Sequence, residues 1–402
     1  MKNKKFRITS VPGFQTAGIA CGIKRNKQRD LTLIVSDTPA VAASVFTLNP
    51  VQAAPVILSR KAMRASRVFR AILVNSGNAN ACTGPQGLKD CRNTIRWLAK
   101  EMKISAKEVL VASTGIIGVP MPAEKIESAM PELVGQLSPR NWKHAAEGIM
   151  TTDLVHKSES VAYTRSGRTI TIAGITKGSG MIHPDMATML GFLVTDAEIS
   201  ARVLQKALKE AVDPTFNSIT VDRETSTNDT VFILANGHAG NASIQSGSPD
   251  YKEFVKHLTE VCKSLAFQII EDGEGATKFA TVRVQGAKSK KAAHIVANSV
   301  ATSPLVKTAL FGADPNWGRI LASAGYAGVP FNPNKTEIRI NELLVFKDGT
   351  PAHGANQAVL QKKMRKKNIF ITIDLHSGKH MHEVYTCDFS YDYVRINAEY
   401  TT

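Results

Sequence analysis

A lone threonine, Thr188, lies between a glycine-containing loop and an apolar run, residues 189–194, that predicts a buried strand. A threonine hydroxyl is a weak nucleophile near neutral pH and needs a base beside it. A threonine that is itself a chain N-terminus carries such a base, because its α-amino group has a pKa of roughly 7.7–8.0. Read alone, however, Ala187-Thr188 would be an ordinary start of a strand.

That chemistry would require a cut in the Ala187–Thr188 peptide bond. The hydroxyl can attack the preceding carbonyl and move the acyl group from nitrogen to oxygen, which leaves an ester that water hydrolyses. Our hypothesis is that Pro184 and the glycines at 178 and 180 hold the loop in a geometry that favours this attack.

The residues around Thr188 read KGSGMIHPDMATMLGF over 177–192, and they resemble the self-cleavage site of the ornithine acetyltransferase family. The similarity extends from Gly13 to Thr402. It implies a cut between Ala187 and Thr188, with Thr188 as the nucleophile. It also implies an α chain of residues 1–187 and a β chain of residues 188–402, which stay together as a heterotetramer of two α and two β chains.

The same resemblance implies an activity in arginine biosynthesis. An enzyme of this family moves the acetyl group from N2-acetylornithine to L-glutamate through an acetyl-threonine intermediate. Acetyl-CoA is a further possible donor, since the family contains enzymes of both kinds. We expect no bound cofactor.

A second segment, Ser113-Thr114-Gly115-Ile116-Ile117-Gly118, follows a predicted strand at 109–112. Acyl transfer needs two donors aimed at the oxygen of the tetrahedral intermediate, and a threonine hydroxyl and a glycine N–H can supply them. By itself the segment would be an ordinary glycine turn after a strand. By resemblance, Thr114 and Gly115 form the oxyanion hole.

The resemblance also assigns contacts to the amino-acid substrate. Lysine can pair with a carboxylate as a point charge, and glutamate could hold an ammonium group. Without the resemblance these side chains would be a surface lysine, an exposed acid and a frayed chain end. The positions that match the family's substrate contacts, Thr188 apart, are Thr151, Lys177, Glu274, Asn397 and Thr402.

The hydrophobic pattern is mixed. Apolar residues at helical spacing predict helices over 88–102, 201–211 and 249–269, with Ser200 and Ser248 as caps. Apolar and β-branched runs predict the strands 31–35, 71–74, 161–165, 169–172, 231–234, 281–284, 338–340, 369–375, 382–387 and 393–398. The alternation lacks a regular βαβ rhythm and favours an α+β fold of αββα type. The resemblance adds a self-processing, N-terminal-nucleophile-like architecture.

The composition narrows the class of protein and its expected location. The chain has 402 residues, 43% of them hydrophobic, which is ample for a core. Its five cysteines form no close pair, and its ten histidines give no zinc-ligand spacing, so we expect reduced thiols and no metal. No apolar run reaches the ~20 residues of a membrane span, and residues 1–7 are basic without a following signal core, so we expect a cytoplasmic protein.

Two alternatives stay open. The net charge of +16 would suit a basic nucleic-acid-binding protein, although aromatic residues make up only 6% of the chain and do not interleave with the basic clusters. A self-processing amidohydrolase or aminopeptidase of related fold would use the same nucleophile with water as the acceptor. Lys177, Glu274 and Asn397 favour a charged amino-acid acceptor instead.

Overall fold

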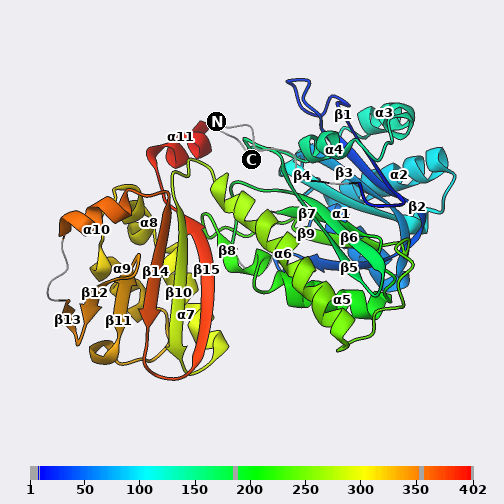
Figure 1. Cartoon of the computed structure of the whole chain (residues 1–402). Helices are drawn as coiled ribbons and strands as arrows, with labels where there is room; N and C mark the ends of the chain where they lie inside the picture. The colour runs from blue at the N-terminus through cyan, green and yellow to red at the C-terminus, as the bar shows by residue number, and fades with distance from the viewer. Residues whose placement is uncertain (1–7, 9, 184–188, 353–356, 400–402) are drawn as a thin grey trace. The chain divides into compact units, whose positions relative to one another are not determined.

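The structure, a computed structural model, describes residue 8 and residues 10–183, 189–352 and 357–399. Ala187, Thr188 and Thr402 therefore lie outside the described residues. The chain divides into two compact units (Figure 1). Over the described residues within these ranges, the first unit comprises 8–217 with 224–269, and the second comprises 218–223 with 270–399.

Within the described residues, the first unit is built on an eight-stranded sheet with the order β4-β3-β2-β9-β7-β6-β5, in which β1 also pairs with β2. The strands β3 and β4 are parallel, as are β7 and β9, and the other neighbours are antiparallel. The strands are β1 (Phe14–Ile19), β2 (Leu31–Phe46), β3 (Val68–Asn78), β4 (Val109–Ile116), β5 (Lys157–Arg165), β6 (Arg168–Lys177), β7 (Leu190–Thr195) and β9 (Thr230–Ala235).

The long strand β2 lets this sheet fold over itself. The register between β2 and β3 shifts between Val35 and Ala40, and beyond that point β2 pairs with β9. Alternate residues of both halves then enter one core, where Ile34 and Ile72 of one half meet Phe192 and Phe232 of the other. The sheet thus forms two facing layers, the ββ part of the predicted sandwich.

Helices cover the outer faces of both layers. The residues of β2, β3 and β4 that point away from the shared core pack against α2 (Gly84–Met102) and α3 (Ala123–Gly135), with α1 (Ala54–Ala65) beside them. Helix α5 (Ala201–Val212) lies against β2, and α6 (Pro249–Glu271) reaches β5 through Gln268, which bonds the backbone of Ser158. The short helix α4 (Trp142–Gly148) contributes Trp142 to the shared core. The unit is an αββα sandwich (Figure 1).

The second unit has its own sheet and core. Over the described residues the sheet order is β13-β12-β11-β14-β10-β15-β8, and its core includes Val282, Val296 and Ile371. The strands are β8 (Ile219–Thr220), β10 (Phe279–Ala287), β11 (Glu337–Ile340), β12 (Leu343–Lys347), β13 (Thr350–Pro351), β14 (Asn368–Asp374) and β15 (His380–Cys387). The helices are α7 (Lys290–Thr302), α8 (Pro304–Phe311), α9 (Trp317–Gly325), α10 (Gln357–Met364) and α11 (Tyr391–Glu399).

Most predicted elements are present, and one is wrong. The helices capped by Ser200 and Ser248 begin where expected, since each serine hydroxyl accepts a backbone N–H of the first turn. Residues 393–398, predicted as a strand, lie in helix α11. The alternation there does not follow burial, because no residue of α11 is buried and Val394 is 67% exposed. Six alternating residues predict a strand only where a sheet edge receives them.

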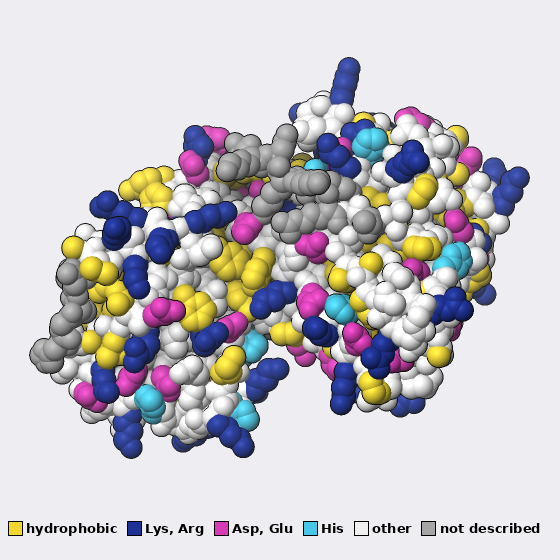
Figure 2. All heavy atoms as spheres, viewed as in Figure 1, with side chains coloured by type: hydrophobic (Ala, Val, Ile, Leu, Met, Phe, Trp, Pro, Cys, Tyr) yellow, Lys and Arg dark blue, Asp and Glu magenta, His cyan; other side chains and the backbone are white. Residues whose placement is uncertain are grey.

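The helices, the surface charges and the cysteines bear on the remaining predictions from composition. Across the described part of the chain, no helix is both long and apolar enough to cross a membrane. Figure 2 shows Lys and Arg side chains spread over the face in view, with Asp and Glu among them. All five cysteines are free thiols.

Candidate active site

The predicted oxyanion segment lies at the end of β4, where it runs beside β3. Thr114 is buried, and Gly115 pairs in register with Gly77. Gly115 has φ of +133°, and a Cβ added there would collide with the Gly77 carbonyl carbon. Only glycine fits this backbone conformation and this close approach. The β3–β4 pairing therefore fixes the backbone next to Thr114.

Lys177 reaches Thr114 from the end of β6. Its side chain is buried, and its Nζ donates a hydrogen bond to Thr114 Oγ1 at 3.1 Å. A hydroxyl that accepts from an ammonium group keeps its own proton available for a second acceptor. Lys177 also pairs in register with Leu190, two residues after Thr188 in the chain. Two predicted site residues from distant strands thus meet directly.

Asp153 links Thr151 to the loop that follows Lys177. Its Oδ2 accepts the Thr151 N–H at 3.0 Å, and its Oδ1 accepts from the Gly178 N–H at 2.8 Å and the Lys157 ammonium at 2.6 Å. Burial by itself raises the pKa of Asp153, but the charges of Lys157 and Lys177 outweigh it and hold the pKa well below its ordinary value. Asp153 is therefore an ionised anchor between the two loops.

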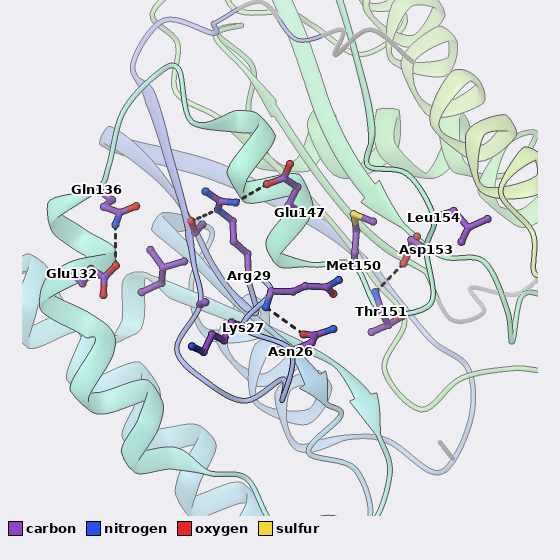
Figure 3. Close-up of a pocket in the computed structure, with 14 residues that line it drawn as sticks. Asn26, Lys27, Arg29, Glu132, Gln136, Glu147, Met150, Thr151, Asp153 and Leu154 are labelled. Carbon is purple, nitrogen blue, oxygen red and sulfur yellow. Dashed lines mark hydrogen bonds and ion pairs between the residues drawn. The ribbon is translucent and has the colours of Figure 1, made fainter. Parts of the chain in front are cut away.

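A hollow of about 710 Å³ opens beside Thr151 in the first unit (Figure 3). In Figure 3 the Thr151 N–H points to Asp153, and Arg29 is bonded to Glu147, with 2.9 Å between the guanidinium nitrogen and the carboxylate oxygen. Both charge signs line the hollow, which suits a small zwitterionic ligand better than an apolar one. Its lining is Gly18, Ile19, Ala20, Asn26, Lys27, Gln28, Arg29, Glu132, Gln136, Glu147, Met150, Thr151, Asp153 and Leu154.

Two further predicted contacts lie together in the second unit. Asn397, on α11, donates from Nδ2 to Glu274 Oε2 at 2.9 Å. Glu274 is 8% exposed, in the turn after α6. The predicted residues thus form two pairs, Thr114 with Lys177 and Glu274 with Asn397, while Thr151 is tied to the Lys177 loop through Asp153.

Comparison with known proteins gives the family. A model of the ArgJ family matches residues 15–402. The chain belongs to the ArgJ family. The arginine biosynthesis bifunctional protein ArgJ of Geobacter sulfurreducens is 48% identical over 98% of this chain and 100% of that protein. The ArgJ protein of Symbiobacterium thermophilum is 44% identical, with 98% of each chain covered.

A solved structure agrees with the ArgJ assignment. The crystal structure of the arginine biosynthesis bifunctional protein ArgJ from Bacillus halodurans is 42% identical, with a TM-score of 0.52. The match covers 53% of this chain and 100% of that one. The recognition of this family from the segment around Thr188 is confirmed.

The residues that sequence reasoning missed lie in the run Thr225–Asp229, just before β9. Its small polar residues are typical of a turn, and the sequence alone predicts no role for them. Asn228 donates from Nδ2 to the Ser113 carbonyl at 2.8 Å, and Asp229 Oδ1 accepts the Met189 N–H at 2.9 Å. The run thus touches the residue before Thr114 and the residue after Thr188. Its composition offered a signal for a turn but none for these partners.

Proposed function

We propose that this chain is a self-cleaving N-acetyltransferase that moves the acetyl group from N2-acetylornithine to L-glutamate in arginine biosynthesis. The observation that carries this proposal is the 48% sequence identity to an ArgJ protein over 98% of this chain. The buried contact between Lys177 and Thr114 supports it, since it holds a hydroxyl beside a glycine backbone at the end of β4. Acetyl-CoA is a possible second donor.

The first step in this proposal is the cut between Ala187 and Thr188. The Thr188 Oγ attacks the Ala187 carbonyl carbon, a C–O bond forms, and the C–N bond breaks as the nitrogen takes a proton. Water then hydrolyses the ester. The products are an α chain that ends in the Ala187 carboxylate, residues 1–187, and a β chain, residues 188–402, that begins with a free amine and hydroxyl.

Acetyl transfer then proceeds in two halves. The Thr188 amine takes the hydroxyl proton as Oγ attacks the acetyl carbonyl, and the hydroxyl of Thr114 and the N–H of Gly115 stabilise the oxyanion. Ornithine leaves after its nitrogen takes the proton. The amine of glutamate attacks the acetyl-threonine ester, and N-acetylglutamate departs while Oγ regains a proton.

The substrate contacts follow the same proposal. Lys177 pairs with a substrate carboxylate, Thr151 lies at the polar hollow, and Glu274 holds an ammonium group with Asn397 beside it. Thr402 completes the set on the resemblance alone. We further propose a cytoplasmic heterotetramer of two α and two β chains.

The test is an acetyl-transfer assay with the purified protein. N2-acetylornithine and glutamate are supplied together and separately, and ornithine and N-acetylglutamate are both quantified. With both substrates we expect equal amounts of the two products, and without glutamate no more than one ornithine per active site, from the first half of the reaction. Ornithine release that continues over many turnovers without glutamate would instead identify a hydrolase and contradict the proposal.

A further inference from the structure

Glu274 is a buried carboxylate that forms no ion pair with any cation among the described residues. It is 8% exposed, and its Oε2 accepts a hydrogen bond from Asn397 Nδ2 at 2.9 Å. Buried charges in proteins are normally paired as well as hydrogen-bonded. The carboxylate is therefore free to pair with an ammonium group of a ligand.

The backbone beside Glu274 is held by the segment that leads into α11. Ser390 is buried, and its Oγ donates to the Gly275 carbonyl at 2.6 Å. Gly275 has φ of +68°, and a Cβ added there would lie 2.5 Å from the Tyr393 backbone nitrogen and 2.7 Å from Ser390 Oγ. Only glycine permits this conformation and this approach. The turn that carries Glu274 is thus in direct contact with residues 390–393.

A further contact fixes the chain that follows the turn. Asp388 is buried, and its Oδ1 accepts the backbone N–H groups of Thr277 and Lys278, both at 2.8 Å. Asp388 and Ser390 therefore hold the backbone on the C-terminal side of Glu274, while Asn397 holds its carboxylate. One stretch of chain, residues 388–397, thus sets the position of the turn and the position of its carboxylate.

We propose that Ser390 is a positioning residue for Glu274, and that it makes this carboxylate selective for an acetyl donor with a side-chain ammonium group. This rests on the proposed function, in which Glu274 holds an ammonium group. The α-nitrogen of N2-acetylornithine is part of an amide and carries no charge, so its ammonium group is the one on the side chain. A pair between this ammonium and Glu274 is strongest when the carboxylate is held in place beforehand. Loss of the Ser390 hydrogen bond lets the turn move and weakens the pair.

The test measures how strongly the enzyme prefers a charged acetyl donor. With glutamate as the acceptor, kcat/KM is determined for N2-acetylornithine and for N2-acetylnorleucine, in which a methyl group replaces the ammonium. The ratio of the two values is compared among the wild type, Ser390→Ala and the matched control Ser299→Ala. Ser299, on α7 in the same unit, also donates from Oγ to a backbone carbonyl, that of Ser323 at 2.7 Å. Circular dichroism checks that each variant is folded.

We expect Ser390→Ala to lower kcat/KM for N2-acetylornithine by about 3–10-fold and to leave kcat/KM for N2-acetylnorleucine within about twofold of the wild type. The ratio falls because only the charged donor uses the Glu274 carboxylate. Ser299→Ala keeps both values. An unchanged ratio in a folded Ser390→Ala, even where both values fall together, overturns the proposal, because the role of Ser390 would then be structural.

Two more variants test whether Ser390 acts through Glu274. In Glu274→Gln the ratio should already be low, and the addition of Ser390→Ala should lower it by less than about twofold more, since residues that act as one unit are not additive. A further fall as large as that in the wild type overturns the proposal. Where Ser390→Ala does not fold, Ser390→Cys keeps the size of the side chain with a weaker donor. It should lower the ratio in the same direction, and an unchanged ratio overturns the proposal.

Failure of this inference and failure of the proposed function give different results. A wild type that transfers no acetyl group from N2-acetylornithine overturns the proposed function. A wild type that transfers the acetyl group without preferring the charged donor leaves that function in place and overturns the inference about Glu274 and Ser390.

Discussion

Two buried aspartates of the first unit, Asp153 and Asp229, differ in how completely they are bonded. Asp153 has both oxygens occupied, by two backbone N–H groups and the Lys157 ammonium. Asp229 Oδ1 accepts the Met189 N–H, while its Oδ2 has no hydrogen bond within standard distance among the described residues, although Ser226 lies close enough to favour the ionised form. Lys177 acts on both, yet the pKa of Asp153 is lowered and that of Asp229 is raised. The cations and N–H groups around Asp153 keep it ionised, whereas around Asp229 the effect of burial outweighs its partners and favours the protonated form.

We expect the largest effect on stability from removal of Lys157, the cation that pairs with Asp153. Lys157→Met takes away a side chain that is fully buried with its partner, and it leaves the Asp153 charge incompletely compensated. We expect a loss of about 3–5 kcal/mol in the free energy of unfolding, measured by urea denaturation. The double variant with Asp153→Asn should recover part of this loss. A loss below about 1 kcal/mol would show that Asp153 is no anchor.

The next largest effect is expected at Thr114, whose hydroxyl contacts Lys177, the cation that acts on both aspartates. Thr114→Ala removes one hydroxyl. That hydroxyl accepts the hydrogen bond from Lys177 Nζ and is also one of the two proposed oxyanion donors. We expect kcat to fall by on the order of 10²–10³, about 2.7–4 kcal/mol in the barrier. The assay is glutamate-dependent ornithine release, with circular dichroism as the control for folding. A variant with near wild-type kcat would remove Thr114 from the oxyanion hole.

The two aspartates also give stability slopes of opposite sign with pH. The lowered pKa of Asp153 contributes stability that is present above its unfolded value, roughly 3.9, and is lost as pH falls. The raised pKa of Asp229 means that the native state keeps a proton that the unfolded chain releases, so stability is lost as pH rises above roughly 3.9.

Each slope reaches at most about 1.4 kcal/mol per pH unit. Urea unfolding between pH 4 and 7 should show that Asp229→Asn gains stability relative to the wild type as pH rises. At acidic pH, Asp153→Asn should lose less stability than the wild type. Parallel curves for the wild type and Asp229→Asn would contradict the raised pKa.

We expect the smallest effect on stability from a change in the ion pair that lines the hollow beside Thr151. Arg29 and Glu147 form an ion pair there with about a third of each side chain exposed, 37% and 29%. Pairs in such positions contribute about 0–1 kcal/mol. Glu147→Gln should therefore change the unfolding free energy by less than about 1 kcal/mol, measured by urea denaturation. A loss as large as that of Lys157→Met would mean that this pair also anchors the fold.

How much the sequence could predict depends on how local each feature is. The strands through 31–35 and 71–74 and the capped helices at Ser200 and Ser248 follow from short-range patterns, and they are present. The contact of Asp229 with Met189 spans 40 residues, and that of Asn228 with Ser113 spans 115. Both pairs depend on the sheet order, in which β9 lies between β2 and β7 while β4 lies beyond β3. No local pattern encodes that order.

The strand predicted over 393–398 is wrong for the opposite reason, because there the local pattern was followed and the surroundings decided otherwise. Val394 and Ile396 alternate with polar residues as in a strand, but they lie on a helix that has no buried residue. Asn397 Nδ2 donates both to the Tyr393 carbonyl one turn earlier and to Glu274. The predicted site residue was thus found on a different element from the one expected.

The most direct test of the account is a denaturing intact-mass spectrum of the purified wild type and of Thr188→Ala. The account predicts two wild-type fragments that meet at Ala187–Thr188, and one uncut chain for the variant. A wild type that stays uncut would leave Thr188 without its amine, and would contradict the self-cleaving mechanism.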